Sequence, residues 1–140
     1  MSNNSLISIL RTNRLMRLKE EIFAFDNALI ELAENPQGTD LQELHLILDD
    51  NCEQPEVMWG LVHFLESFDA KEQLQALLNV IPQLVISAPE WTEIIHYRIL
   101  NHEPTRFLYQ DMLKFSDSNT QQIVSKILSD IAQKHQLMNV

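Results

Sequence analysis

Residues 55–68 read PEVMWGLVHFLESF, and the order of their apolar residues decides the fold class. Steps of three or four positions place these residues on one face of an α-helix, and the set is Met58, Leu61, Val62, Leu65 and Phe68. Pro55 suits the first turn of such a helix, because its missing N–H would have no helical partner there. The stretch therefore predicts an amphipathic helix that begins at Pro55 and ends near Phe68.

The same spacing continues toward the C-terminus. It predicts a helix that Asp69 opens and that Pro82 ends or kinks. Ser87-Ala-Pro-Glu90 reads as a capping box that opens the next helix, and Pro104 opens another. Residues 116–119 read as a loop and a cap before a last helix, whose apolar stripe is Ile123, Val124, Ile127, Leu128 and Ile131.

Toward the N-terminus, one apolar stripe continues past Glu20 without a break, through Leu15, Leu18, Ile22, Phe25, Leu29 and Leu32. This stripe predicts one uninterrupted helix that ends near Asn35. Asp40, with Glu43 three residues later, is expected to cap a short helix that reaches about Leu48.

The composition and the regular spacing of helix starts together predict the fold class. Only two of the 140 residues are glycine, which argues against the tight turns that a sandwich, a barrel or a Rossmann fold requires. Helix starts recur about every 15–18 residues, and short connections make neighbouring helices antiparallel. We therefore expect one all-α domain over residues 1–140, with six to seven antiparallel helices. Two arrangements stay open, a compact irregular bundle and a short HEAT-like stack of α-hairpins.

Charge is segregated along the chain, whose net charge is −10. Residues 1–19 hold four basic residues and no acidic one, whereas residues 20–56 hold 11 acidic residues and no basic one. Such a field repels nucleic acid and anionic membranes and attracts basic proteins. We expect an acidic binding face for a basic protein, formed by Glu31, Glu34, Asp40, Glu43, Asp49, Asp50 and Glu53. A surface that only keeps the protein soluble is the alternative.

These acidic side chains are predicted to lack a local cationic partner, because no base occurs within residues 20–56. Reversal of Glu43, Asp49 and Asp50 to lysine is therefore expected to weaken binding to a basic partner without unfolding the protein.

Several function classes find no support in the sequence. It has no Gly-rich phosphate loop, no secretory signal and no apolar run long enough to span a bilayer, so we expect a cytoplasmic protein. Cys52 is the only cysteine and lies among acidic residues, which disfavours the thiolate. Glu93 and His96 have the E-x-x-H spacing of di-iron bundles, but those sites need two such pairs and further glutamates. We expect no catalytic residue, no metal and no cofactor.

Arg98 lies within the apolar stripe of residues 91–99, between Ile95 and Ile99. A buried arginine requires a carboxylate, and Glu66 is the expected partner. A catalytic or anion-binding site is one interpretation of these residues. A buried polar network that fixes helix register is the favoured one, and its members are Trp59, His63, Glu66, Arg98 and Asn101. His45, His102 and His135 are expected on the surface or in loops.

Three blocks of this sequence resemble the immunity protein 30 family of bacterial polymorphic-toxin and contact-dependent growth inhibition systems. The blocks are Glu56-Val-Met-Trp-Gly-Leu-Val-His-Phe-Leu-Glu66, Ala88-Pro-Glu-Trp91 and Arg98-Ile-Leu-Asn101, and the similar region spans about residues 49–113. The resemblance implies an all-α cytoplasmic protein that binds and neutralises a cognate toxin C-terminal domain. It supplies no catalytic residue, and the shared residues read as scaffold.

A nuclease is the toxin class that an acidic inhibitor fits, because a nuclease channel must be basic to hold phosphates. Two other interpretations stay open. One is an acidic helical adaptor or chaperone that binds another basic protein, and the other is a small helical metal-dependent enzyme.

Overall fold

The computed structural model describes the backbone of residues 1–138 and the side chains of residues 1–135, and this part of the chain is α-helical without a strand. The helices are α1 (Asn3–Asn13), α2 (Lys19–Glu34), the 3-10 turn η1 (Gly38–Asp40), α3 (Leu41–His45), α4 (Pro55–Glu66), α5 (Ala70–Ser87), α6 (Pro89–Leu100), α7 (Glu103–Leu113) and α8 (Ser118–Met138). The predicted all-α class is confirmed. The described residues form eight α-helices, slightly more than the six to seven expected.

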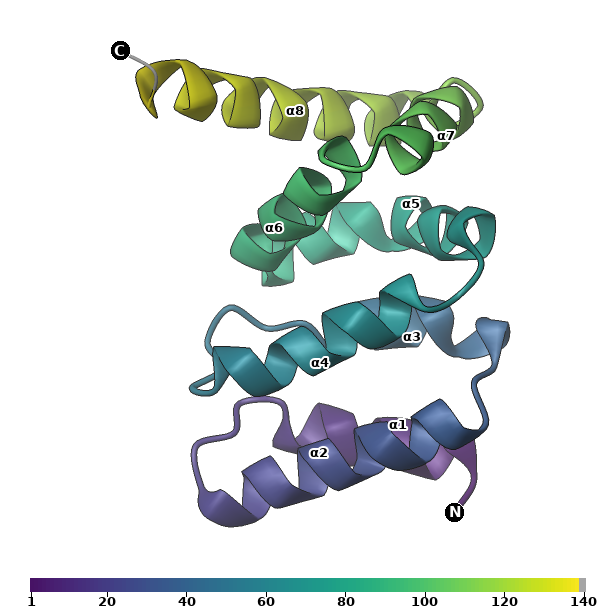
Figure 1. Cartoon of the computed structure of the whole chain (residues 1–140), viewed down its shortest axis with the longest axis vertical. Coiled ribbons are helices and arrows are strands. Elements are labelled where there is room, and N and C mark those ends of the chain that lie inside the picture. The colour runs from purple at the N-terminus through teal and green to yellow at the C-terminus, as the bar shows by residue number, and fades with distance from the viewer. Residues whose placement is uncertain (139–140) are drawn as a thin grey trace.

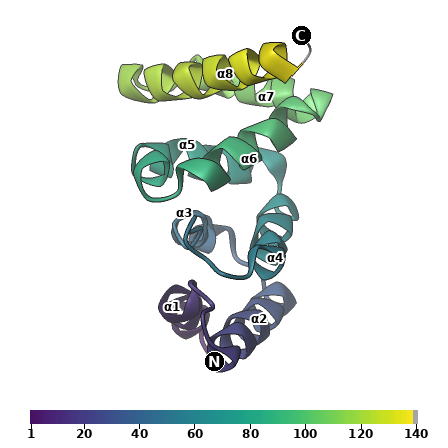
Figure 2. The ribbon, with the colours of Figure 1, turned by 90° about the vertical axis from the view of Figure 1, so that its left-hand side faces the viewer.

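The helices form pairs that stack in layers along the longest axis of the molecule (Figure 1). The layers are α1 with α2, α3 with α4, α5 with α6, and α7 with α8. The view turned by 90° shows α1, α3 and α5 along one side of the stack and α2 and α4 along the other (Figure 2). The arrangement is the α-hairpin stack rather than the irregular bundle.

The second layer (α3 with α4) and the third layer (α5 with α6) pack more closely on one side of the stack than on the other. On one side α3 packs directly against α5, whose apolar face lies at the centre of the core. On the other side α4 and α6 meet through side chains, which include the edge-to-face pair of Trp59 and Trp91 at 5.6 Å. The layer junction is therefore closed at α3–α5 and open at α4–α6.

Local signals place several helix starts as predicted. Pro55 occupies the first position of α4, and the Asp69 carboxylate accepts a hydrogen bond from the backbone N–H of Glu72 at 3.2 Å. The Asp117 carboxylate accepts one from Thr120 N–H at 2.7 Å at the start of α8. Pro82 does not end its helix, because α5 continues to Ser87.

The single helix expected across Glu20 is wrong, because the chain reverses between α1 and α2. Met16 adopts a left-handed backbone with φ 49°, which a non-glycine residue rarely does, and its side chain is fully buried. The Glu21 carboxylate accepts hydrogen bonds from the N–H groups of Arg17 (2.8 Å) and Leu18 (3.1 Å), which gives α2 an N-terminus of its own. Only the later part of the predicted stripe, from Ile22 to Leu32, lies on α2. Leu15 and Leu18 lie in the connection, and Leu18 is 61% exposed, so their helical spacing is coincidental and does not reveal the turn.

Two predicted caps are also wrong. The Asp40 side chain makes no capping bond; it is buried and accepts a hydrogen bond from the Asn3 amide at 3.0 Å. Ser87 belongs to α5, and the N-cap position of α6 is held by Ala88, which has no side-chain acceptor.

Asp50 caps α6 from a distant part of the chain. One of its carboxylate oxygens accepts a hydrogen bond from Glu90 N–H at 2.9 Å, and the other accepts one from Trp91 N–H at 3.1 Å. The Trp91 indole N–H donates to the Asp49 carbonyl at 3.1 Å. The connection between α3 and α4 (residues 46–54) is thereby tied to the first turn of α6.

Two histidines are enclosed in the core. The expectation of a surface or loop position for His45 is wrong, because His45 is the last residue of α3 and is fully buried. The Nδ1 atoms of His45 and His96 each lie 2.7 Å from the carbonyl oxygen four residues earlier, so Nδ1–H donates. The Nε2 atom of His96 accepts from the Tyr109 hydroxyl at 2.7 Å, and that of His45 lies 3.4 Å from the Gln73 amide nitrogen. Burial lowers the pKa of each imidazole to about 4, so both rings are neutral at pH 7.

We predict that removal of the Asp50 carboxylate destabilises the fold. Asp50→Ala leaves two N–H groups of α6 without their acceptor and should lower the free energy of unfolding by about 1–2 kcal/mol. Asp50→Asn retains one oxygen and should cost less. Urea unfolding measures both variants, with the exposed Glu53→Ala as the control; equal stability of all three variants would contradict the capping role.

We predict that stability falls as the pH is lowered through the range from about 6.5 to about 4. In this window the unfolded chain protonates His45 and His96 while the folded protein does not, so each ring lowers the free energy of unfolding by up to about 1.4 kcal/mol per pH unit. Urea unfolding at about pH 7 and about pH 5.5 measures the loss, and His45→Gln and His96→Gln should each flatten it. If the free energy of unfolding depends on pH equally strongly in both variants and in the unchanged protein, these histidines are not the cause of the loss.

Candidate functional site

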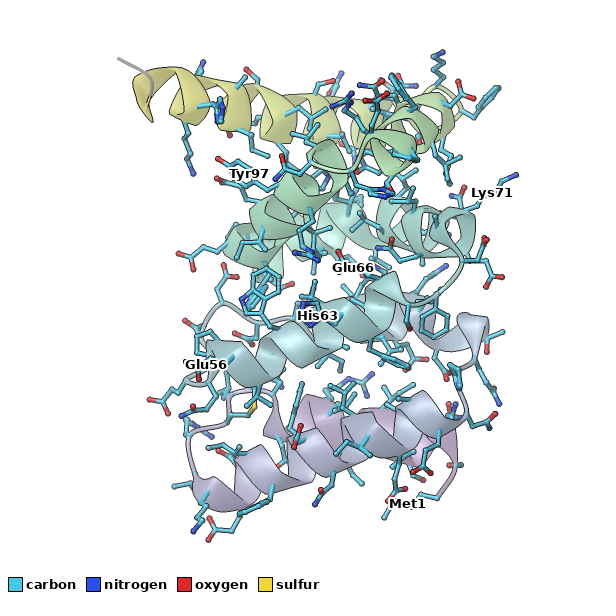
Figure 3. All side chains as sticks on the ribbon, viewed as in Figure 1. Met1, Glu56, His63, Glu66, Lys71 and Tyr97 are labelled. Atoms are coloured by element: carbon cyan, nitrogen blue, oxygen red, sulfur yellow. The ribbon has the colours of Figure 1, made fainter. Side chains whose placement is uncertain are left out.

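A groove of about 450 Å³ lies at the open junction between α4 and α6, and residues at the starts of α5 and α7 complete its lining. Its floor is apolar and includes Val62, Leu65, Ile95 and Ile99, and its walls carry polar side chains, namely Glu66, Arg98, Asn101, His102 and Thr105. In Figure 3, His63 and Glu66 lie on the side of α4 that faces α6. We call this hollow the α4–α6 groove.

Glu66 and Arg98 form a two-point ion pair across this groove. Arg98 Nε donates to Glu66 Oε2 at 2.5 Å, and Arg98 Nη2 donates to Oε1 at 2.8 Å. The Glu66 carboxylate raises the pKa of Arg98 by favouring the charged guanidinium. The structure therefore contains the expected partnership.

The expected burial of Arg98 is wrong, because 40% of its side chain is exposed to solvent. The apolar stripe of α6 faces the core through Trp91, Ile95 and Ile99, and Arg98 lies at the edge of this stripe, over the groove. The separation of α4 from α6 keeps water close to the pair. Arg98 consequently makes a solvated ion pair, which contributes less to stability than a buried one.

Trp59 joins this pair to the rest of the predicted polar network. The Arg98 guanidinium carbon lies 5.3 Å from the Trp59 ring centroid, a cation–π distance, and the His63 ring lies 5.8 Å from the same tryptophan. Asn101 lines the groove beside them without a hydrogen bond from its side chain to the described residues. Four of the five residues thus contact one another in series, and the fifth borders the same hollow.

The seven residues of the predicted acidic face do not form one patch. Asp40 is buried against Asn3, Asp50 caps α6, and Asp49 binds the Arg14 guanidinium at 3.0 Å. Glu43 pairs with Arg11 at 3.2 Å. The statement that these acids lack a local partner is wrong for Glu43 and Asp49, because α1 folds back and brings its arginines onto the acidic segment.

The remaining three acidic residues are Glu31 and Glu34 on α2 and Glu53 before α4. They are exposed and make no ion pair with any side chain of residues 1–135. Because Asp49 pairs with Arg14 and Asp50 caps α6, their reversal to lysine is expected to destabilise the fold, contrary to the expectation from the sequence. Sequence reasoning missed the capping by Asp50 because nothing near residue 50 points to a helix 40 residues away.

The metal and nucleophile candidates are engaged elsewhere. Glu93 binds Lys134 Nζ at 2.7 Å, whereas His96 is buried against Tyr109, so the E-x-x-H pair is divided between two environments. Among the described residues, no group of three or more His, Cys, Asp or Glu side chains could hold a metal ion. Burial raises the pKa of the Cys52 thiol, which disfavours the reactive thiolate. Within residues 1–138, no helix has the length and apolar character to cross a bilayer.

A family model described as Immunity protein 30 matches residues 12–109, which is more than half of the chain. The chain belongs to the immunity protein 30 family. The match begins well before the region of resemblance near residue 49 and extends from the end of α1 into α7, so it includes both walls of the α4–α6 groove. No curated protein and no solved structure matches the chain.

We predict that Arg98→Ala lowers the free energy of unfolding of this immunity protein by about 1 kcal/mol, well below the 3–5 kcal/mol that a buried pair would cost. The loss combines a solvated ion pair with the contact to Trp59. Urea unfolding of Arg98→Ala, Glu66→Gln and the double variant isolates the coupling between the two charges. A loss above about 3 kcal/mol would contradict the solvated character of the pair.

Proposed function

We propose that this immunity protein neutralises a cognate toxin domain by binding it in a stoichiometric complex in the cytoplasm. Membership of the immunity protein 30 family over residues 12–109 is the observation that carries the proposal. The resemblance places such proteins in polymorphic-toxin and contact-dependent growth inhibition systems.

The charge of the protein supports a basic partner. The net charge is −10, and α2, α4, α6 and the segment before α4 present several carboxylates that form no ion pair with the side chains of residues 1–135, among them Glu31, Glu34, Glu53, Glu56 and Glu90. A nuclease domain fits this field, because its channel must be basic to hold a phosphate backbone. Opposite fields also accelerate association, which an inhibitor of a toxic enzyme requires.

We predict that co-expression with its cognate toxin domain protects cells and that the two proteins purify as a complex of fixed stoichiometry. The association rate should fall at least tenfold when salt is raised from about 50 to about 500 mM, because the screening length shrinks about threefold. Surface plasmon resonance with a catalytically inactive toxin measures this rate without interference from the reaction.

The other interpretations predict different results. An acidic adaptor or chaperone would bind a basic protein and give no protection. A helical enzyme would protect at substoichiometric amounts and without a stable complex. Either outcome would overturn the proposal.

A further inference from the structure

We propose that the α4–α6 groove is the socket in which this protein receives a basic side chain, lysine or arginine, from its protein partner. The inference rests on the proposed function for the identity of that partner as the toxin. It assigns to the groove a binding role in place of the purely structural one expected from the sequence.

The shape and lining of the groove suit a long basic side chain. Its volume of about 450 Å³ lies in the lower part of the range for binding pockets. The apolar floor, which includes Val62, Leu65 and Ile99, can cover the methylene stem of a lysine or arginine. Glu66 stands on the wall, where the cationic group would arrive.

Glu66 retains capacity for a second cation although it already binds Arg98. An ionised carboxylate offers about four lone-pair directions, and Arg98 occupies two of them, one on each oxygen. The Glu66 side chain is 35% exposed, so an incoming donor can reach the remaining positions. Arg98 is already held in place by Glu66 and Trp59. Binding of a partner therefore adds no further loss of conformational entropy for the Arg98 side chain.

The charge around the groove selects a cation rather than an anion. Residues 53–69 and 88–103 contain α4 and α6. Apart from Glu66 and Glu93, which pair with Arg98 and Lys134, these ranges hold five carboxylates that form no ion pair with the side chains of residues 1–135. Arg98 is already neutralised by Glu66.

Asn101 gives a direct test, because it lines the groove, is exposed and lies just after the last residue of α6. Asn101→Lys places a cation of the protein itself beside Glu66, where it competes with the incoming side chain. A lysine at a helix C-terminus is compatible with the helix dipole, so the variant should fold normally. Asn101→Asp, which adds the opposite charge, is the matched partner variant.

Gln122→Lys is the control for net charge. Gln122 is exposed on α8, which contributes no residue to the groove, so this variant changes the total charge by the same amount as Asn101→Lys. Any general weakening of long-range attraction should therefore affect both lysine variants equally.

Binding of the inactive toxin domain to the four proteins is measured by surface plasmon resonance, after thermal melting has shown that all are folded. We expect Asn101→Lys to raise Kd at least tenfold, mainly through faster dissociation, and Asn101→Asp to lower Kd, because it adds a carboxylate to the socket. Gln122→Lys should stay within about twofold of the unchanged protein. Equal Kd values for the two lysine variants would overturn the socket and leave toxin binding intact. Failure of the unchanged protein to bind the toxin domain would instead overturn the proposed function.

Discussion

The position of the two central layers depends on one carboxylate. Asp50 accepts hydrogen bonds from two N–H groups at the start of α6 and so ties the α3–α4 connection to a helix of the next layer. The closest packing between these layers lies on the other side of the stack, between α3 and α5. The groove between α4 and α6 exists because one side of the junction is held by helix packing and the other by a loop. The Glu66–Arg98 pair, its solvation and its proximity to Trp59 follow from that separation.

The parts of this fold that could be read from the sequence are those set by nearby residues. Pro55 at the start of α4 and Asp69 at the start of α5 act on backbone groups within three residues, so their spacing reveals them. The break at Met16 and the true cap of α6 could not be read, because each depends on residues that only the folded chain brings together.

Charge illustrates the same limit. The net charge of residues 20–56 is fixed by composition. How many of these acidic side chains stay unpaired and exposed depends on which helix packs against this segment in the folded protein. Arg11 and Arg14 follow the spacing of one face of α1, and that face lies against Glu43 and Asp49. For the candidate site, the pairing of Arg98 with Glu66 follows from the need of an arginine for a carboxylate. The exposure of the Arg98 side chain could not be predicted from the sequence, because it depends on the separation of α4 and α6 in the folded protein.

The layered arrangement also bears on how quickly the protein becomes active. Each layer is built from two helices that are consecutive in the chain, and successive layers join through short connections (Figure 1). Contacts between segments that are close in sequence require little loop closure, and helical proteins of this topology fold within microseconds to milliseconds. Synthesis of a chain on the ribosome takes seconds, so folding adds almost nothing to the delay before a new copy can act. The supply of folded protein is therefore limited by its rate of synthesis rather than by its rate of folding.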